Sequence, residues 1–261
     1  MADIATVAIG EPGWIDLASS DPAASHTFYA TLFGWSVDVV PDPEAGGYGM
    51  FKLGGKEVAG VGPRPSEEQP PAWTIYLLVD DAAAALAKAT DAGGTVIAGP
   101  IDVMGEGTMG VLADPSGAVI GIWQPGRHRG FELKGVPGSF TWAELNSSDM
   151  PADKRFYQTV FGWNAQDSGI PGVDYTLFKL GGESFAGGMS MGPGAPAGAP
   201  SNWIVYFDVA DTDAAVAKLT GLGGGVHHAP EDIPGVGRFA VVHDPQGAVF
   251  GLLQNTQTAA S

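Results

Sequence analysis

Two carboxylates stand at matching places in this chain, each two residues after a tryptophan. Asp16 follows Trp14, and Glu144 follows Trp142, so the two pairs lie 128 residues apart. Residues two apart in a strand point to the same face, so each carboxylate would share its face with an indole. Such a carboxylate can bind a ligand hydroxyl or amine, or act as a general base if burial raises its pKa. The alternative is structural: a carboxylate paired with an Arg or with backbone N–H groups.

A turn motif repeats at nearly the same spacing. Asp-Pro-x-Gly begins at Asp114 and again at Asp244, and an apolar run of strand length follows each copy. Pro fixes φ at the second turn position, and Gly accepts the conformation that closes the turn. Other motifs recur 127 to 130 residues apart, among them Phe28-Tyr29 with Phe156-Tyr157 and Phe33-Gly34-Trp35 with Phe161-Gly162-Trp163. The chain is therefore predicted to be an internal duplication.

The elements that must position these residues follow one order. Trp14 to Ala18 has strand character, and Asp21-Pro22 then begins a helix, with Asp as N-cap and Pro at the first helical position. Three more strands are expected before the order restarts at Trp73. Each half thus holds two βαβββ units, four in all. We place the first domain at residues 10–126 and the second at residues 137–256.

Composition limits the possible partners. The chain has 261 residues, 44% of them hydrophobic, which suffices for two domains with cores of their own. There is no cysteine, so a disulfide framework and thiolate chemistry are excluded. The net charge of −17 disfavours nucleic acid and anionic membranes. With no signal peptide or spanning apolar run in the sequence, we expect a cytoplasmic protein, as a monomer or a homodimer.

These motifs together carry a family resemblance. Two βαβββ units per half, Phe-Tyr followed by Phe-Gly-Trp, Val-Asp-Asp before the second helix and Asp-Pro-x-Gly before the last strand resemble the vicinal oxygen chelate superfamily. That superfamily includes glyoxalase I, extradiol dioxygenases and bleomycin-resistance proteins. More closely, the chain is similar to tandem two-domain members found in actinobacteria. The resemblance implies an α+β fold in which each domain curls into a half-open barrel.

The resemblance also implies four inward strand positions per domain that hold a metal. The matching residues are Trp14, approximately Gly60, Thr74 and Gly121 in the first domain, and Trp142, approximately Gly187, Ile204 and Gly251 in the second. Indole, methyl and glycine groups supply no ligand for a divalent metal. We therefore expect no metal and no other cofactor, which excludes the metal-dependent mechanisms of the superfamily.

Strand alternation predicts what lines each pocket in place of metal ligands. Asp16 and Glu144 are the candidate catalytic residues. The predicted ligand-binding residues are Trp14, Thr74, Tyr76, Gly121 and Trp123 in the first domain and Trp142, Asn146, Tyr206, Asp208 and Gly251 in the second. Aromatic walls with a few polar anchors are typical of a small-molecule site, and the glycines would leave room for a flat ligand. The alternative is that Trp14 and Trp142 belong to the core, where we place Trp73 and Trp203 because their strand parity is the opposite one.

The five histidines are interpreted as surface residues. His26 lies on the first predicted helix, His128 in the connection between domains, and His227, His228 and His243 near the last two strands. Adjacent strand residues point to opposite faces, so His227 and His228 cannot easily bind one metal. A catalytic His243 or a metal at His228 remains an alternative.

Two functional hypotheses follow. The first is a metal-free binding protein for a flat, mostly apolar ligand, such as an aromatic natural product, an antibiotic or a polyketide intermediate, acting in resistance or as a biosynthetic accessory. The second is an enzyme: an isomerase, cyclase or hydroxylase with Asp16 or Glu144 as base, or a lyase or dioxygenase whose metal site the sequence does not reveal. A third hypothesis keeps one degenerate domain for structure. The second domain, with more polar side chains, would then be the active one.

Overall fold

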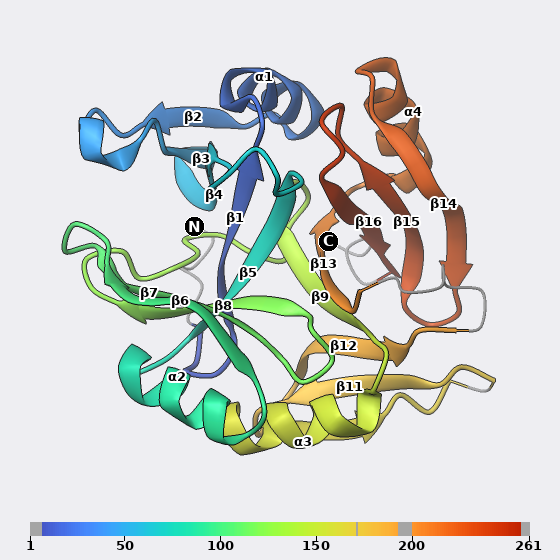
Figure 1. The fold of residues 1–261 in the computed structure, drawn as a ribbon. Helices are drawn as coiled ribbons and strands as arrows, with labels where there is room; N and C mark the ends of the chain where they lie inside the picture. The colour runs from blue at the N-terminus through green and yellow to red at the C-terminus, as the bar shows by residue number, and fades with distance from the viewer. Residues whose placement is uncertain (1–6, 171, 193–199, 257–261) are drawn as a thin grey trace.

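The computed structural model describes residues 7–170, 172–192 and 200–256 (Figure 1). Its elements follow the predicted order of four βαβββ units. The first half contains β1 (Pro12–Ser19), α1 (Pro22–Phe33), β2 (Ser36–Val39), the short helix η1 (Pro43–Ala45), β3 (Gly49–Leu53), β4 (Lys56–Pro63), β5 (Ala72–Leu78), α2 (Ala82–Asp91), β6 (Thr95–Asp102), β7 (Gly107–Ala113) and β8 (Val119–Pro125).

The second half repeats this series. It contains β9 (Phe140–Ser147), α3 (Met150–Phe161), β10 (Asn164–Asp167), β11 (Tyr175–Lys179), β12 (Ser184–Ser190), β13 (Asn202–Asp208), α4 (Thr212–Gly221), β14 (Gly225–Ile233), β15 (Gly237–His243) and β16 (Val249–Asn255). The predicted α+β class with two tandem domains is confirmed. None of the helices in the described ranges is long and apolar enough to cross a bilayer.

Each half builds one open sheet of eight strands. The order is β2-β3-β4-β1-β5-β8-β7-β6 in the first half and β10-β11-β12-β9-β13-β16-β15-β14 in the second. Antiparallel pairing of β1 with β5 joins the two units of the first half, and β9 with β13 does so in the second. The register puts Asp16 between Gly60 on β4 and Thr74 on β5. Both candidate carboxylates therefore lie at the centre of a sheet, since Glu144 has the equivalent neighbours Gly187 and Ile204.

Local sequence signals explain where the helices begin and end. Asp21 caps α1, because its Oδ1 accepts a hydrogen bond from the backbone N–H of Ala24 at 3.0 Å, and Asp81, Asp149 and Asp211 cap the other helices in the same way. Gly34 ends α1 in the left-handed conformation, with φ of 76°. The N-cap predicted at Asp21 is thus present.

The two halves share one hydrophobic core. Ile15 and Leu17 are buried on the helix side of β1, opposite to Asp16, and the buried cluster that contains them extends into the second half. Trp73 and Trp203 belong to it, as predicted. Figure 1 shows α1 beside α4 and α2 beside α3, so each helix pair joins one half to the other.

Reciprocal hydrogen bonds fasten the halves together. The Tyr29 hydroxyl on α1 donates to Asp244 Oδ2 in the second Asp-Pro turn at 3.1 Å, and the Tyr157 hydroxyl on α3 donates to Asp114 Oδ2 in the first at 3.0 Å. The duplication is therefore also a structural pseudo-symmetry, in which each half contributes the same group to its neighbour.

Candidate functional site

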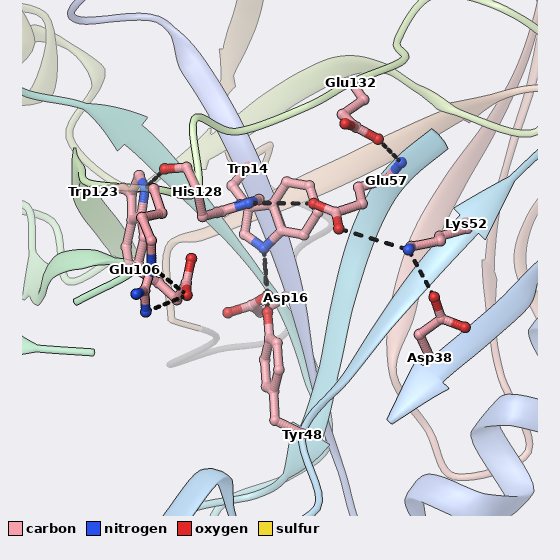
Figure 2. Close-up of polar contacts among 11 residues, drawn as sticks. Trp14, Asp16, Asp38, Tyr48, Lys52, Glu57, Glu106, Trp123, His128 and Glu132 are labelled. Atoms are coloured by element: carbon pink, nitrogen blue, oxygen red, sulfur yellow. Dashed lines mark hydrogen bonds and ion pairs between the residues drawn. The ribbon is translucent and has the colours of Figure 1, made fainter. Parts of the chain in front are cut away.

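The first candidate site is a partly buried cluster around Asp16 on β1. Asp16 Oδ1 accepts a hydrogen bond from the Trp14 indole N–H at 2.8 Å and from the Tyr48 hydroxyl at 2.6 Å (Figure 2). Tyr76 on β5 lies close enough to lower the pKa of Asp16, and Asp16 raises the pKa of Tyr76 in turn. Asp16 and Tyr48 keep part of their surface exposed, so the cluster can be reached from solvent.

The second half contains the same arrangement around Glu144 on β9. Glu144 accepts hydrogen bonds from the Tyr175 hydroxyl at 3.0 Å and from the Tyr206 hydroxyl at 3.2 Å. The Trp142 indole N–H donates to the Tyr175 hydroxyl at 2.9 Å. Each half therefore brings its predicted Trp and carboxylate together with two phenols.

The inward glycines make room for these phenols. A Cβ added to Gly60 would lie 1.8 Å from the Tyr48 hydroxyl, and one added to Gly121 would lie 2.3 Å from the Tyr76 ring. Gly187 stands in the same relation to Tyr175 at 2.2 Å, and Gly251 to Tyr206 at 2.0 Å. The space that we expected a flat ligand to use above Gly121 and Gly251 is thus filled by tyrosine rings, and a ligand would meet the rings rather than the backbone.

Burial shifts the proton affinities of the cluster. Desolvation raises the pKa of Asp16, although the hydrogen bonds from Tyr48 and Trp14 oppose it. The pKa of Glu144 is raised for the same reason, against hydrogen bonds from Tyr175 and Tyr206. The tyrosine pKa values also rise, first through burial and then through the nearby carboxylate. These phenols therefore remain protonated and act as donors.

The donor set does not fit a divalent metal. Gly60, Gly121 and their equivalents offer no side-chain ligand, and tyrosine rings occupy the volume that a ligand from those positions would need. Across the described ranges, no group of three or more His, Cys, Asp or Glu side chains gathers as a metal site would require.

The other predicted lining residues occupy different environments. Thr74 and Asn146 are partly exposed on the inner face, whereas Trp123 is buried and donates its indole N–H to the His128 carbonyl at 3.1 Å. Asp208 is fully buried, and its Oδ2 accepts a hydrogen bond from Asn255 at 2.7 Å. The inner wall of the second half is an apolar cluster separate from the shared core, made of Ile204, Tyr206 and Leu253 with Trp142, Phe239 and Val241 packed against them.

Sequence reasoning missed Tyr48 and Tyr175. Both are partly buried, and they supply the shortest phenol contacts to Asp16 and Glu144. They lie 127 residues apart, the spacing that also relates Leu53-Gly54-Gly55 to Leu180-Gly181-Gly182, so the repeat itself carried the signal.

The interpretation of His128 as a surface residue was wrong. Its side chain is only 11% exposed, and its ring packs edge-on against Trp14 with centroids 4.3 Å apart. Its Nδ1 lies 3.4 Å from Glu57 Oε2 on β4. The segment after β8 therefore packs against the first site instead of being exposed to solvent. His26 is likewise partly buried, against Phe51.

A further hollow of about 380 Å³ lies apart from both carboxylates. Its lining comes from the start of β1, the segment between the halves, the start of β9 and the β11–β12 turn, and includes Pro12, Lys134, Phe140 and Phe185.

Comparison with known proteins shows which family this chain belongs to. The family model of the Glyoxalase/Bleomycin resistance protein/Dioxygenase superfamily matches residues 11–122 and 139–252. The chain belongs to this superfamily. The anthracycline biosynthesis protein DnrV of Streptomyces peucetius is 41% identical over 259 residues, which cover 94% of this chain and 93% of DnrV. CFP32 of Mycobacterium tuberculosis, provisionally named a glyoxylase, is 41% identical over 250 residues, which cover 94% and 95% of the two chains.

Solved structures confirm the fold. The Mn(II)-bound glyoxalase from Novosphingobium aromaticivorans superposes with a TM-score of 0.66 at 19% identity, covering 94% of this chain and 82% of the other. The 2,3-dioxygenase LapB from Pseudomonas sp. KL28 gives 0.67 at 13% identity, covering 96% and 94%. At this level of identity the likeness extends to the superfamily fold and no further.

Proposed function

We propose that this member of the superfamily binds a flat, largely apolar molecule of the aromatic polyketide type and acts as an accessory in its biosynthesis. The observation that carries the proposal is the carboxylate of each half, held by phenol hydroxyls with an indole bonded to the same cluster. The partly exposed rings of Tyr48, Trp142 and Tyr175 offer stacking surfaces beside one strong hydrogen-bond acceptor. The 41% identity to an anthracycline biosynthesis protein supports the choice of ligand class.

General-base catalysis is the second candidate function. It is favoured by the raised pKa of Asp16 and of Glu144, because a carboxylate with a higher proton affinity is a better base near neutral pH. The same carboxylates would then remove a proton from a bound polyketide in an isomerisation or cyclisation. A metal-dependent lyase or dioxygenase is disfavoured by the chemistry of the inward residues.

Tryptophan fluorescence tests the binding proposal. An anthracycline titrated into the protein should quench the emission, and Asp16→Asn and Glu144→Gln should each weaken binding by about tenfold, the loss expected for one hydrogen bond to a charged group. Asp91→Asn is the control, since this carboxylate is exposed at the end of α2. Quenching that is absent, or that weakens equally in the control, would contradict the proposal.

The same samples separate binding from catalysis. Liquid chromatography coupled to mass spectrometry should return the ligand unchanged in both retention time and mass if the protein only binds, because an isomerised product would keep the mass but change the retention time. A product that forms with the native protein and disappears in Asp16→Asn or Glu144→Gln would establish the second function. Elemental analysis of the purified protein should find no stoichiometric transition metal, and one ion per half would overturn the proposal of a metal-free site.

A further inference from the structure

The hollow between the two halves is a second place where a small molecule can enter. At about 380 Å³ it has the size of a small-molecule pocket, which is about 300–1,000 Å³. Both sheets and the segment that connects the halves contribute to its lining. Asp16 and Glu144 do not line it. Whatever the hollow binds is therefore held by other groups than the two carboxylate sites.

Apolar side chains supply part of this lining. Phe140, at the start of β9, is buried and forms a fixed part of the wall. Leu180 and Phe185, on the two sides of the β11–β12 turn, are partly exposed, so their surface can contact an aromatic ring. Thr141 and Ser184 add hydroxyl groups to the lining. An apolar wall with a few polar groups is typical of a site for a small organic molecule.

Lys134, in the segment that connects the halves, brings an amine to the hollow. Its side chain is partly buried, and among the residues that the structure describes it has no hydrogen bond and no ion pair. By contrast, Lys88 and Lys218 each donate to a backbone carbonyl at the end of a helix. The amine of Lys134 is therefore available to a molecule that enters the hollow.

The surroundings of Lys134 favour its neutral, nucleophilic form. Burial lowers the pKa of Lys134, because desolvation disfavours the ammonium, and the nearby Glu11 carboxylate opposes this shift only in part. Glu11 lines the same hollow, so a group that can take a proton lies close to the amine. Partly buried lysines of this kind act as nucleophiles toward carbonyl compounds.

We propose that the hollow binds a small aromatic aldehyde or ketone and that Lys134 forms an imine with it. The ammonium first gives its proton to Glu11 or to solvent, and the neutral amine then attacks the carbonyl carbon. A carbon–nitrogen double bond replaces the carbonyl double bond, and the oxygen leaves as water with the two amine hydrogens. The step needs no oxidant or reductant. It goes beyond the proposed function, because it uses a different site and forms a covalent bond.

Reductive trapping tests the proposal. The whole chain is incubated with naphthaldehyde and sodium cyanoborohydride, which converts an imine into a stable secondary amine, and peptide mapping by mass spectrometry locates the adduct. Lys134 should be labelled about tenfold faster than Lys154, a partly exposed lysine on α3, because binding in the hollow raises the local concentration of the aldehyde. The α-amino group of the chain also reacts, and its adduct lies on a different peptide.

Further measurements separate binding in the hollow from simple reactivity. The labelling rate of Lys134 should saturate as the naphthaldehyde concentration rises, and it should fall when naphthylmethanol, which has the same rings and no carbonyl, competes for the hollow. Lys134→Arg keeps the positive charge and should abolish this adduct, whereas the matched control Lys154→Arg should leave it unchanged. Near-UV circular dichroism confirms that each variant is folded; if Lys134→Arg is not, the competition on the native protein decides.

Each outcome decides one point. Labelling of Lys134 that is no faster than that of Lys154 overturns the imine. Fast labelling that rises linearly with the aldehyde and is not reduced by naphthylmethanol overturns binding in the hollow. Saturable labelling of Lys134 that naphthylmethanol reduces supports the proposal, and it does so whether or not the carboxylate sites bind an anthracycline.

Discussion

In each site, a tyrosine ring packs directly over a glycine of the neighbouring strand, and the two residues depend on each other. The phenol that holds Glu144 from β13 lies over Gly251 on the neighbouring strand β16, and Tyr76 lies over Gly121 in the same way. The glycine is needed because any side chain would collide with the ring, and the ring is needed because the carboxylate would otherwise be buried without that donor. The two positions therefore constrain each other.

Gly251→Ala tests this unit. The added methyl would lie 2.0 Å from the Tyr206 ring, so the ring must move and its hydrogen bond to Glu144 is lost. We expect a loss of stability of about 1–3 kcal/mol, as for other overpacked cores. Thermal and denaturant unfolding measure the change. Gly182→Ala is the matched control, because nothing lies within 4 Å of its added Cβ, and its effect should stay within about 0.5 kcal/mol.

Among the elements, the two Asp-Pro turns differ in charge: the first has a second carboxylate next to its Asp, and the second does not. Asp114 is buried beside Asp153 on α3, and desolvation and that second carboxylate raise its pKa to about 6. In the other half the place of Asp153, 128 residues earlier, belongs to Ser25. The turns are equal in shape, but only the first places two carboxylates together.

The stability of the protein should therefore fall as pH rises from about 4 to 6. Asp114 binds its proton more tightly folded than unfolded, so the folded state holds more protons in this range, and the stability contributed by the protonated form is lost as pH passes the folded pKa. Asp153→Ser, which copies the other half, should flatten this slope because it lowers the pKa of Asp114. Thermal unfolding at a series of pH values measures it; an unchanged slope in the variant would contradict the coupling.

How far the sequence predicts these elements depends on how local the signal is. The Asp N-caps, the glycines that end α1 and α3, and the strand parity of Asp16 follow from neighbouring residues, and the structure contains them. The contact of Tyr48 with Asp16 spans 32 residues and depends on how β3 curls toward β1, and the position of His128 depends on where the connecting segment packs. Neither has a strand or helix periodicity in its own segment, so that signal could not find them; for Tyr48 only the 127-residue repeat with Tyr175 was informative.

At the scale of the whole molecule, each half supplies a lysine that binds the end of a helix in the other half. The Lys88 ammonium on α2 donates to the Val160 carbonyl at the end of α3, at 3.0 Å, and Lys218 on α4 does the same for Leu32 at the end of α1, at 3.2 Å. A cation there also opposes the negative end of the helix dipole. The domain limits proposed from the sequence thus separate two sequence repeats that have one common core.

One cooperative unfolding transition is the consequence of that common core. Phe239 on β15 packs on the inner apolar wall of the second half, away from the shared core. Phe239→Ala should cost about 1–2 kcal/mol, because the ring is partly buried. If the halves unfold together, this loss must appear in the global unfolding of both. Hydrogen exchange resolved by segment should then show β1 and β5 losing as much protection as β9 and β13. Loss confined to the second half would mean that each half holds its stability alone, despite the reciprocal tyrosines.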